Sequence, residues 1–570
     1  MKENKKLKVS YDISKQIKSE EKASNDVAIT TEKPEAGKFR TILPQILAST
    51  AKNLLLLDLG LSAAFPTIVI PALRGTVQNN GYVETLRFTD VQASWFGSIA
   101  FICQPLGSVL SGWVSEPLGR KKAMIVVNIP HIIAWILLHF ATSIEEMYIG
   151  AILLGLGVGF MEAPIITYVG EISQPSIRGI LISCAGVAVT LGLFITYLLG
   201  SVLDWRTAAL ICLSVPLFTI VAICFVPETP MWLLSKGRKD EALKSLQWLR
   251  GWVSPKAVEK EFAEMQRYSE HSNKCTKCQK ANVPCPHPPP TLNQKFKELK
   301  RKRTMKAFFL VLTLFAIGQF SGILSMRPFM VQIFKAYKVP MDPSWATVTI
   351  GIIALLANIA CMSTVKIIGK RRICLIGLVG SLICCIALGS YAQTMFPKGY
   401  NSFESMDDEN IPTSYFPLVA FLFLGFWTNG GVTSIPWMLL SEIFPFKSRG
   451  LATGITAALN YTLGFISTKT YLNLDKGLSL NGVILFYVYF LLPETENRTL
   501  EDIEVHFSDN TRKLTDINIE KVGAITRKQS PENGQINLAT IDGVKKDGVT
   551  IPTISQDIEL GCDNRAYLEN

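Results

Sequence analysis

The chain has 570 residues, of which 48% are hydrophobic and only 18% are charged, and its mean hydropathy is +0.28. This composition argues against a soluble protein of several domains, which would carry more charge. The net charge of +11 does not indicate nucleic-acid binding, because most basic residues lie in the tails or beside apolar blocks, as in loops that face anionic lipid. Many of the 12 cysteines lie inside apolar blocks, so no disulfide framework is expected.

The apolar residues form blocks of about 20, the length that a helix needs to cross ~30 Å of hydrocarbon. Residues 1–40 are rich in Lys and Glu, which predicts a disordered cytoplasmic tail without a cleavable signal peptide. Basic residues follow the second and fourth blocks, and this asymmetry predicts a cytoplasmic N-terminus. The predicted spans are 42–73, 91–114, 123–141, 148–169, 180–203 and 207–226 in the first half, and 307–334, 345–365, 373–391, 415–440, 451–471 and 481–492 in the second.

The last predicted span is unusually short. Residues 481–492 make about 18 Å of helix, against ~30 Å of hydrocarbon, which suggests a natural deletion, a splice difference or a gene-model error. The polar segments are interpreted as a central cytoplasmic loop with short helices, between two helix bundles, and a disordered cytoplasmic C-terminal tail. The predicted divisions of the chain are therefore 1–40, 41–226, 227–306, 307–492 and 493–570.

Three sequence marks occur in the same order in both halves of the chain. They are a Glu followed by an Arg-Gly pair (Glu171 to Gly179, then Glu442 to Gly450), a basic turn (120–122, then 370–372) and a Pro-Glu-Thr triplet (227–229, then 493–495). Each mark lies at the edge of an apolar block, where topology alone would require only positive charge. This internal repeat predicts a duplicated membrane transport protein.

The complete set of motifs is Gly112…Glu116…Gly119-Arg120-Lys121-Lys122, Gly170-Glu171…Arg178-Gly179, Pro227-Glu228-Thr229-Pro230-Met231-Trp232, Gln319-Phe320-Ser321-Gly322-Ile323, Ile435-Pro436-Trp437, Glu442…Arg449-Gly450 and Pro493-Glu494-Thr495…Arg498-Thr499-Leu500-Glu501. In this order the motifs resemble the sugar-porter family of the major facilitator superfamily, and within it insect facilitated trehalose transporter-like proteins. The resemblance implies an all-α polytopic membrane protein of the major facilitator fold, with two six-helix bundles. It further implies a monomeric plasma-membrane carrier of a small-molecule sugar in the lipid bilayer, with both termini in the cytoplasm. Such a carrier is no enzyme, needs no cofactor and binds no nucleic acid.

Charged residues at the predicted cytoplasmic ends of the spans are costly unless they are paired or hydrated. We interpret them as an ion-pair gate that forms only when the cytoplasmic side is closed, as alternating access requires. The alternative is that they only set topology. The family pattern has an acid before the second basic turn, where this chain has Lys366, so the second gate is less complete. The predicted gate residues are Glu116, Arg120, Lys121, Glu171, Arg178, Glu228, Lys370, Arg371, Glu442, Arg449 and Glu494.

Glycines and prolines in the seventh and tenth spans predict broken helices that line a wet cavity between the halves. The resemblance places the sugar contacts at Gln319, Trp437 and Asn460. An amide exchanges hydrogen bonds with a hydroxyl pair, and an indole covers a sugar C–H face. A hydroxyl left unpaired costs about 1–3 kcal/mol, which favours a larger or less polar substrate, or a disaccharide bound with waters. This cost arises because four amides of the family pattern are replaced here, by Gly186, Gly318, Leu324 and Ala354.

Asp58, Glu162 and Arg327 lie inside predicted spans, where a charged residue is a functional candidate. The alternative is that each belongs to a structural pair that faces the cavity. The proton-coupling Asp of the family pattern matches a position near Ser62 rather than Asp58, which favours facilitated diffusion.

Two further motifs have weaker interpretations. Cys275, Cys278, Cys285 and His287 in the central loop are residue types that bind zinc, but a flexible loop with incidental cysteines is the favoured interpretation, so no metal is predicted. Gly155-x-Gly157-x-Gly159 superficially resembles a nucleotide-binding loop. Its place inside an apolar span predicts close helix packing instead.

The sequence therefore predicts a carrier that moves trehalose or another saccharide down its gradient by alternating access. Two alternatives stay open. A non-transporting membrane sensor or a defective isoform would account for the missing amides and the short last span. A proton-coupled sugar symporter would use Asp58 or Glu162.

Overall fold

The structure of the chain is a computed structural model that describes residues 37–75, 86–272, 302–321, 323–395, 413–444 and 449–474. Within these residues it contains helices and no strand. All of them belong to one compact unit. The zinc candidates, Glu494 and the predicted span 481–492 lie outside the described residues.

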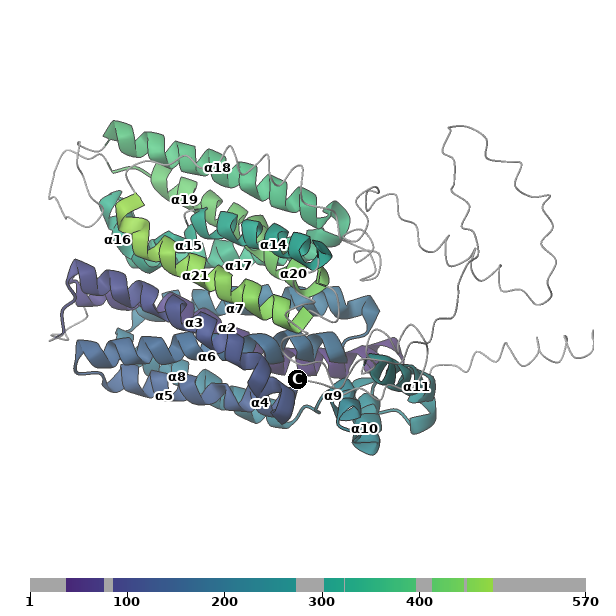
Figure 1. Cartoon of the computed structure of the whole chain (residues 1–570). Coiled ribbons are helices and arrows are strands. Elements are labelled where there is room, and N and C mark those ends of the chain that lie inside the picture. Colours follow the sequence, from purple (N-terminus) through teal and green to yellow (C-terminus); the bar gives the residue numbers. More distant parts are fainter. Residues whose placement is uncertain are drawn as a thin grey trace, which may run out of the picture. The chain divides into compact units, whose positions relative to one another are not determined.

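The six predicted spans of the first half are all helical (Figure 1). The third span consists of two helices that meet at Val127. Two starts are fixed by reciprocal capping boxes, between Thr89 and Gln92 and between Ser143 and Glu146. The helices are α2 (Lys38–Leu73), α3 (Asp90–Leu118), α4 (Arg120–Val126), α5 (Asn128–Phe140), α6 (Ile144–Ile172), α7 (Pro175–Val202) and α8 (Trp205–Cys224).

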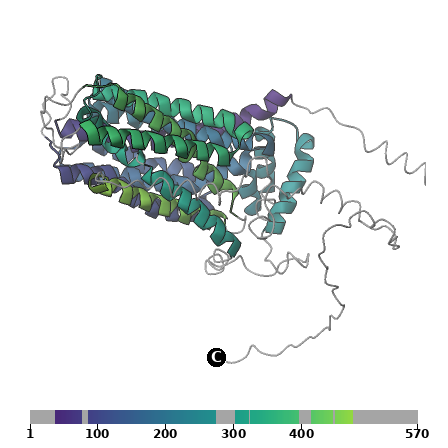
Figure 2. The same cartoon turned by 90° about the horizontal axis from the view of Figure 1, so that it is seen from above.

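Three shorter helices follow the first half and lie together at one end of the long helices (Figures 1 and 2). They are α9 (Pro230–Ser235), α10 (Lys239–Leu249) and α11 (Pro255–Ser272). α10 is amphipathic, and it buries Leu246 and Leu249 on one face. Trp232 and Leu233 of α9 pack in a small apolar cluster with Ala242 of α10.

The second half contains two interrupted spans, as the sequence predicts. Its seventh span bends by 50° between α14 and the segment that begins with α15. Its tenth span contains a π-helical turn, η2, between α19 and α20. The elements are α14 (Lys302–Phe320), α15 (Ile323–Met326), η1 (Arg327–Phe329), α16 (Met330–Ala336), α17 (Pro343–Ile368), α18 (Lys370–Met395), α19 (Phe416–Trp427), η2 (Thr428–Val432), α20 (Ser434–Glu442) and α21 (Arg449–Leu474).

Nine helices of the described part are long and apolar enough to cross a membrane, or ten when the bent pair counts as one span. Large apolar side chains on their outer faces are exposed, such as Ile133, Phe218 and Phe423. A soluble protein would bury such side chains, whereas hydrocarbon accepts them. The chain is therefore a multi-pass membrane protein.

Close backbone contact in the first half depends on glycine. A Cβ atom on Gly155 would lie 2.2 Å from the carbonyl oxygen of Ala100, and one on Gly159 would lie 2.2 Å from that of Gln104. α6 therefore packs directly on the backbone of α3. The prediction of close helix packing for the Gly155-x-Gly157-x-Gly159 motif is confirmed.

The two halves meet along two pairs of helices. α21 of the second half packs along α3 of the first, and α17 of the second packs along α7 of the first. In the internal repeat, the second span corresponds to the eighth and the fifth to the eleventh. The two pairs are thus related by the repeat, which is the arrangement expected of two bundles that face each other across a pseudo-two-fold axis.

Candidate functional site

The predicted sugar contact Gln319 lies in the last turn of α14, just before the break in the seventh span. Its carbonyl oxygen accepts hydrogen bonds from the hydroxyls of Ser325 (3.1 Å) and Ser467 (2.8 Å). These serines, on α15 and α21, thus supply donors at the point where the regular helix stops. Its side-chain Nε2 donates to Oδ1 of Asn460 on α21 at 2.9 Å. The structure thus brings together two of the three predicted contacts.

The third predicted contact, Trp437 of α20, lies against the neighbour of Asn460 in the sequence. Its ring centroid is 6.1 Å from that of Tyr461 and 5.0 Å from that of Phe315. The hydroxyl of Tyr461 donates to the carboxylate of Glu162 on α6. This hydrogen bond connects the two halves, and we call Glu162, Gln319, Trp437, Asn460 and Tyr461 the central site.

Asn358 lies close to two positions where amides of the family pattern are replaced, Gly186 and Ala354. Asn358 is one turn along α17 from Ala354, and its Oδ1 accepts a hydrogen bond from Ser434 at 2.9 Å. A Cβ atom on Gly186 of α7 would lie 3.0 Å from the same oxygen. The glycine that replaces a family amide thus makes room for an amide from the other half. The sequence signal for this amide was the spacing of four residues between Ala354 and Asn358, which places both on the same face of a helix.

The first basic turn is held by a buried carboxylate. Gly119 has φ +89°, and a Cβ atom there would lie 2.3 Å from Oε2 of Glu228, so only glycine fits. Glu228 accepts hydrogen bonds from the backbone N–H groups of Arg120 (3.0 Å), Lys121 (3.1 Å) and Thr229 (2.9 Å). It therefore caps α4 from another segment and places negative charge at the helix N-terminus. Burial raises the pKa of the Glu228 carboxyl above its ordinary value, and these N–H groups oppose that rise.

Two side chains of this turn contact the neighbouring helix ends. Nη2 of Arg120 forms an ion pair with Oε1 of Glu171 at 2.9 Å, with both side chains about one-fifth exposed. Nζ of Lys121 donates to the carbonyl oxygen of Cys224 at 2.9 Å. The carbonyl oxygen of Glu116 accepts a hydrogen bond from Nε1 of Trp232 at 3.0 Å, whereas the Glu116 side chain is exposed. The predicted residues Arg120, Lys121, Glu171 and Glu228 thus form one connected group, which we call the first gate.

The predicted gate residue Arg178 has a different kind of partner. Its Nη2 donates to the carbonyl oxygen of Ser173 at 3.2 Å, which closes the turn between α6 and α7. Beside it, Arg250 at the end of α10 forms an ion pair with Glu261 of α11 at 2.6 Å and donates to the carbonyl oxygen of Ile172 at 3.3 Å. Sequence reasoning missed this pair, because two charges in a polar segment carry no signal of burial.

The second gate is described only in part. Gly369 repeats the backbone of Gly119, with φ +88°. Lys370, which follows it, is buried with 4% exposure, and Arg371 is partly buried. The side chains of Glu442 and Arg449, together with all of Glu494, lie outside the part that the structure describes.

The three predicted intramembrane charges lie in separate places. Asp58 is fully buried within the first half, where Nε1 of Trp135 donates to it at 3.0 Å and Nε2 of His131 lies 3.7 Å away. Glu162 belongs to the central site. Arg327 begins η1, and its carbonyl oxygen accepts a hydrogen bond from Thr67 of α2 at 2.9 Å. Lys52 of α2 is a further buried ionisable residue, and its position inside an apolar span was a visible signal.

A second set of contacts between the halves lies at the opposite end of the bundle from Arg120. Nζ of Lys469 on α21 lies 3.9 Å from the ring centroid of Trp95 on α3 and 3.3 Å from Oγ of Ser94. Trp95 also contacts Phe465, with 6.3 Å between the ring centroids. Such a cation–π contact is worth about 0.5–2 kcal/mol. This contact was missed in the sequence because neither Lys469 nor Trp95 belongs to a repeated motif.

Among the described residues, no group of three or more His, Cys, Asp or Glu side chains is arranged to hold a metal ion. The zinc candidates lie outside those residues, so their interpretation stays a prediction. The central site instead presents amides, an indole and a carboxyl. Amides and carboxyls exchange hydrogen bonds with hydroxyl groups, and an indole presents a flat apolar face.

Known proteins match both the sequence and the fold. The family described as "Sugar (and other) transporter" matches residues 45–507. A facilitated trehalose transporter, Tret1, from Polypedilum vanderplanki is 28% identical over 491 residues, which cover 84% of this chain and 90% of the relative. Tret1 from Apis mellifera ligustica is 28% identical over 506 residues, which cover 87% of this chain and 94% of the relative.

Solved structures match the fold. The proton:xylose symporter XylE, bound to 6-bromo-6-deoxy-D-glucose, has a TM-score of 0.62 and 20% identity, and the match covers 82% of this chain and 100% of that one. XylE from E. coli in a partially occluded inward-open conformation has a TM-score of 0.60 and 20% identity, and the match covers 80% of this chain and 99% of that one. The fold is thus that of a major facilitator superfamily protein, and the chain belongs to the sugar (and other) transporter family.

Proposed function

We propose that this protein carries a saccharide across the plasma membrane by alternating access, as a facilitated transporter. One observation carries the proposal: Gln319 and Asn460 form a hydrogen bond where the seventh span is broken, and Trp437 of a third helix lies against Tyr461, the residue after Asn460. Broken helices between two repeated bundles are where transporters bind their substrates. In this proposal, the hydrogen bond between Gln319 and Asn460 exchanges for hydrogen bonds to sugar hydroxyls.

The first gate supports the mechanism. The pair between Arg120 and Glu171 joins the ends of α4 and α6 within the first bundle. In this proposal it keeps the first half of the gate in shape while the two bundles move against each other. In the proposed orientation this gate, Lys370, Arg371 and both chain termini face the cytoplasm, and the contact between Lys469 and Trp95 closes the outer side. The bundles are proposed to comprise residues 41–226 and 307–492, joined by a loop at 227–306.

The substrate is proposed from the relatives and from the site. Relatives are named as facilitated trehalose transporters, which makes trehalose the first substrate to test. The amides replaced at Gly318 and Leu324 remove hydrogen-bond partners that a monosaccharide would use. Asn358 of α17 and Ser434 of α20 add polar groups on other helices than those of Gln319 and Asn460. A disaccharide with bridging waters fits this distribution.

The direct test is uptake of labelled trehalose and glucose by the full chain in liposomes. We expect saturable uptake, and Trp437→Ala should reduce the initial rate about tenfold, equivalent to ~1.4 kcal/mol. The matched control is Trp345→Ala, since this tryptophan is 46% exposed on the outer side of α17. Absence of saturable uptake of any sugar by a correctly inserted protein would reject the proposal in favour of a sensor or a defective isoform. A variant with about ten more apolar residues in the last span distinguishes the sensor from the defective isoform, because uptake should return only if the short span is the defect.

Proton-coupled transport is a second candidate because Glu162 lies in the central site. The carboxylate of Asp58 is held inside the first half by Trp135 and His131. Coupling would therefore use Glu162, whose carboxyl already shares a hydrogen bond between the halves. Uptake driven by an inward proton gradient, and lost in Glu162→Gln, would favour this candidate. Uptake insensitive to the gradient would support facilitated diffusion.

A further inference from the structure

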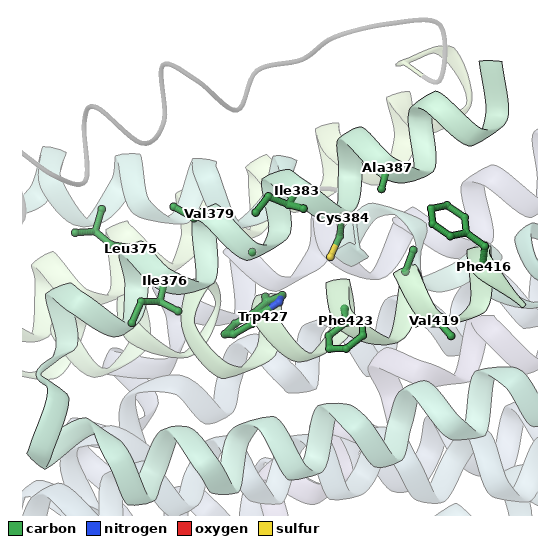
Figure 3. Close-up of a pocket in the computed structure, with 12 residues that line it drawn as sticks. Leu375, Ile376, Val379, Ile383, Cys384, Ala387, Phe416, Val419, Phe423 and Trp427 are labelled. Carbon is green, nitrogen blue, oxygen red and sulfur yellow. The ribbon is translucent and has the colours of Figure 1, made fainter. Parts of the chain in front are cut away.

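A long apolar groove lies between α18 and α19, on the outer side of the second half (Figure 3). Its volume is about 620 Å³. Leu375, Ile376, Val379 and Ile383 of α18 form one wall, and Val419 and Phe423 of α19 form the other. No charged or amide side chain lines it, so its contents must be apolar.

The position of one tryptophan shapes the groove. The ring of Trp427 lies against Gly380, where a Cβ atom would come within 2.5 Å of the ring. Any larger residue would push the indole outward into the groove. Ile376, Ile383 and Phe423 are 48%, 62% and 54% exposed, so the groove opens to the outside of the protein. In a multi-pass membrane protein, that outside is lipid.

A positive charge stands at one end of this groove. Arg372 precedes Ile376 by four residues and Val379 by seven, so the three side chains lie along one face of α18. Arg372 is exposed, in contrast to the buried Lys370. From Leu375 to Ala387 the groove runs along about 18 Å of helix, close to half of the ~30 Å hydrocarbon thickness. It thus extends inward from a basic residue by about the depth of one leaflet.

We propose that this groove binds one anionic phospholipid, with an acyl chain between α18 and α19 and its phosphate at Arg372. The apolar lining selects a hydrocarbon chain, and the guanidinium selects a phosphate oxygen pair. The depth of one leaflet argues for a lipid from the adjacent monolayer. The proposal does not depend on the transported substrate.

The internal repeat provides a matched control. Lys122 and Arg372 each stand three residues after the glycine that starts the repeat-related helices. Ile129 and Ile133 of α5 match Val379 and Ile383, and they are both 50% exposed. Charge and exposure recur there, but the lining of the groove consists of residues of α18 and α19 and includes none of α4 or α5. Lys122→Gln therefore removes an equivalent charge without the groove.

The test measures quenching of Trp427 by phospholipids with brominated acyl chains in the full-length purified protein. The Trp427 signal is defined as the difference between wild type and Trp427→Phe. We expect brominated phosphatidylserine to quench it at about fivefold lower mole fraction than brominated phosphatidylcholine, the ratio for ~1 kcal/mol per basic residue. Arg372→Gln should abolish this preference, and Lys122→Gln should keep it.

A second variant tests the apolar part independently. Ala387→Phe fills the groove and retains Arg372, and it should reduce quenching by both lipids. Equal quenching of the wild type by the two lipids would overturn the proposal, as would a preference that survives in Arg372→Gln. It would also be overturned if neither lipid quenched Trp427, because residues 477–492 or a second copy of the chain would then occupy the groove.

Discussion

The two basic turns have the same backbone but different surroundings. Gly119 and Gly369 both have left-handed backbones, with φ +89° and +88°, and each begins a helix that crosses the membrane. The residue after Gly119 is an arginine that reaches Glu171, whereas the residue after Gly369 is a lysine with 4% exposure. The duplicated feature is therefore the glycine turn, and the residue that follows it differs in type and exposure between the halves. The differences have direct experimental consequences.

Removal of the carboxylate from the first turn should have the largest effect. Glu228→Ala leaves three backbone N–H groups without their acceptor, and we expect the free energy of unfolding to fall by about 3 kcal/mol. The control is Glu241→Ala, which breaks a surface pair with Arg238 and should cost less than about 1 kcal/mol. Thermal unfolding in detergent measures both, and equal Tm values for the two variants would contradict the capping role of Glu228.

The next prediction compares the loss of Tm in two glycine-to-alanine variants, one with a close neighbour and one without. Gly119→Ala places an alanine at φ +89° and ψ 169°, a strained region that costs about 1–3 kcal/mol, and puts a methyl group 2.3 Å from Glu228. Gly237→Ala also places an alanine at a positive φ, +76°, but it has no neighbour within 4 Å, so it should lower the Tm by less.

Gly369→Ala then tests the symmetry of the two turns. If Glu494 occupies the position equivalent to Glu228, as the repeat predicts, Gly369→Ala should lower the Tm as much as Gly119→Ala. A loss no greater than that of Gly237→Ala would show that the second turn has no carboxylate cap.

A smaller effect is expected for the partly exposed ion pair. Arg120→Gln removes the charge that pairs with Glu171, and we expect a coupling of about 0.5–1 kcal/mol with Glu171→Gln in a double-mutant cycle. If the pair closes the proposed gate, each single variant should also change the uptake rate. A coupling of zero in both stability and uptake would mean that these charges only set topology.

The smallest effect concerns pH. Burial raises the pKa of Glu228 in the folded protein, so the folded state binds this proton more tightly than the unfolded state does. This contribution to stability is present below the ordinary carboxyl pKa and is lost as the pH rises through the raised value. Glu228→Gln should remove that component from the pH profile of the Tm. An unchanged profile would show that Glu228 does not titrate in this range.

Much of the fold was predictable because the length of each apolar block, and the motifs repeated at the block edges, can be recognised from the sequence alone. The broken spans followed from glycines and prolines, which weaken a helix wherever they occur. The partners of single charges were not predictable in this way. Asp58 lies in an apolar span like Glu162, but it meets Trp135 and His131 within its own half, whereas Glu162 meets Tyr461 of the other half.

The sequence by itself determined the number and order of the described spans, the internal repeat and the residue types at the central site. These depend on helix length and on the cost of charge in hydrocarbon, which any segment carries alone. Only the tertiary structure decided that Gln319 meets Asn460, that Glu228 caps a helix far from it in the chain, and that Trp427 opens a groove beside Gly380. Such contacts depend on the relative positions of whole helices, which the packing of all the spans sets together.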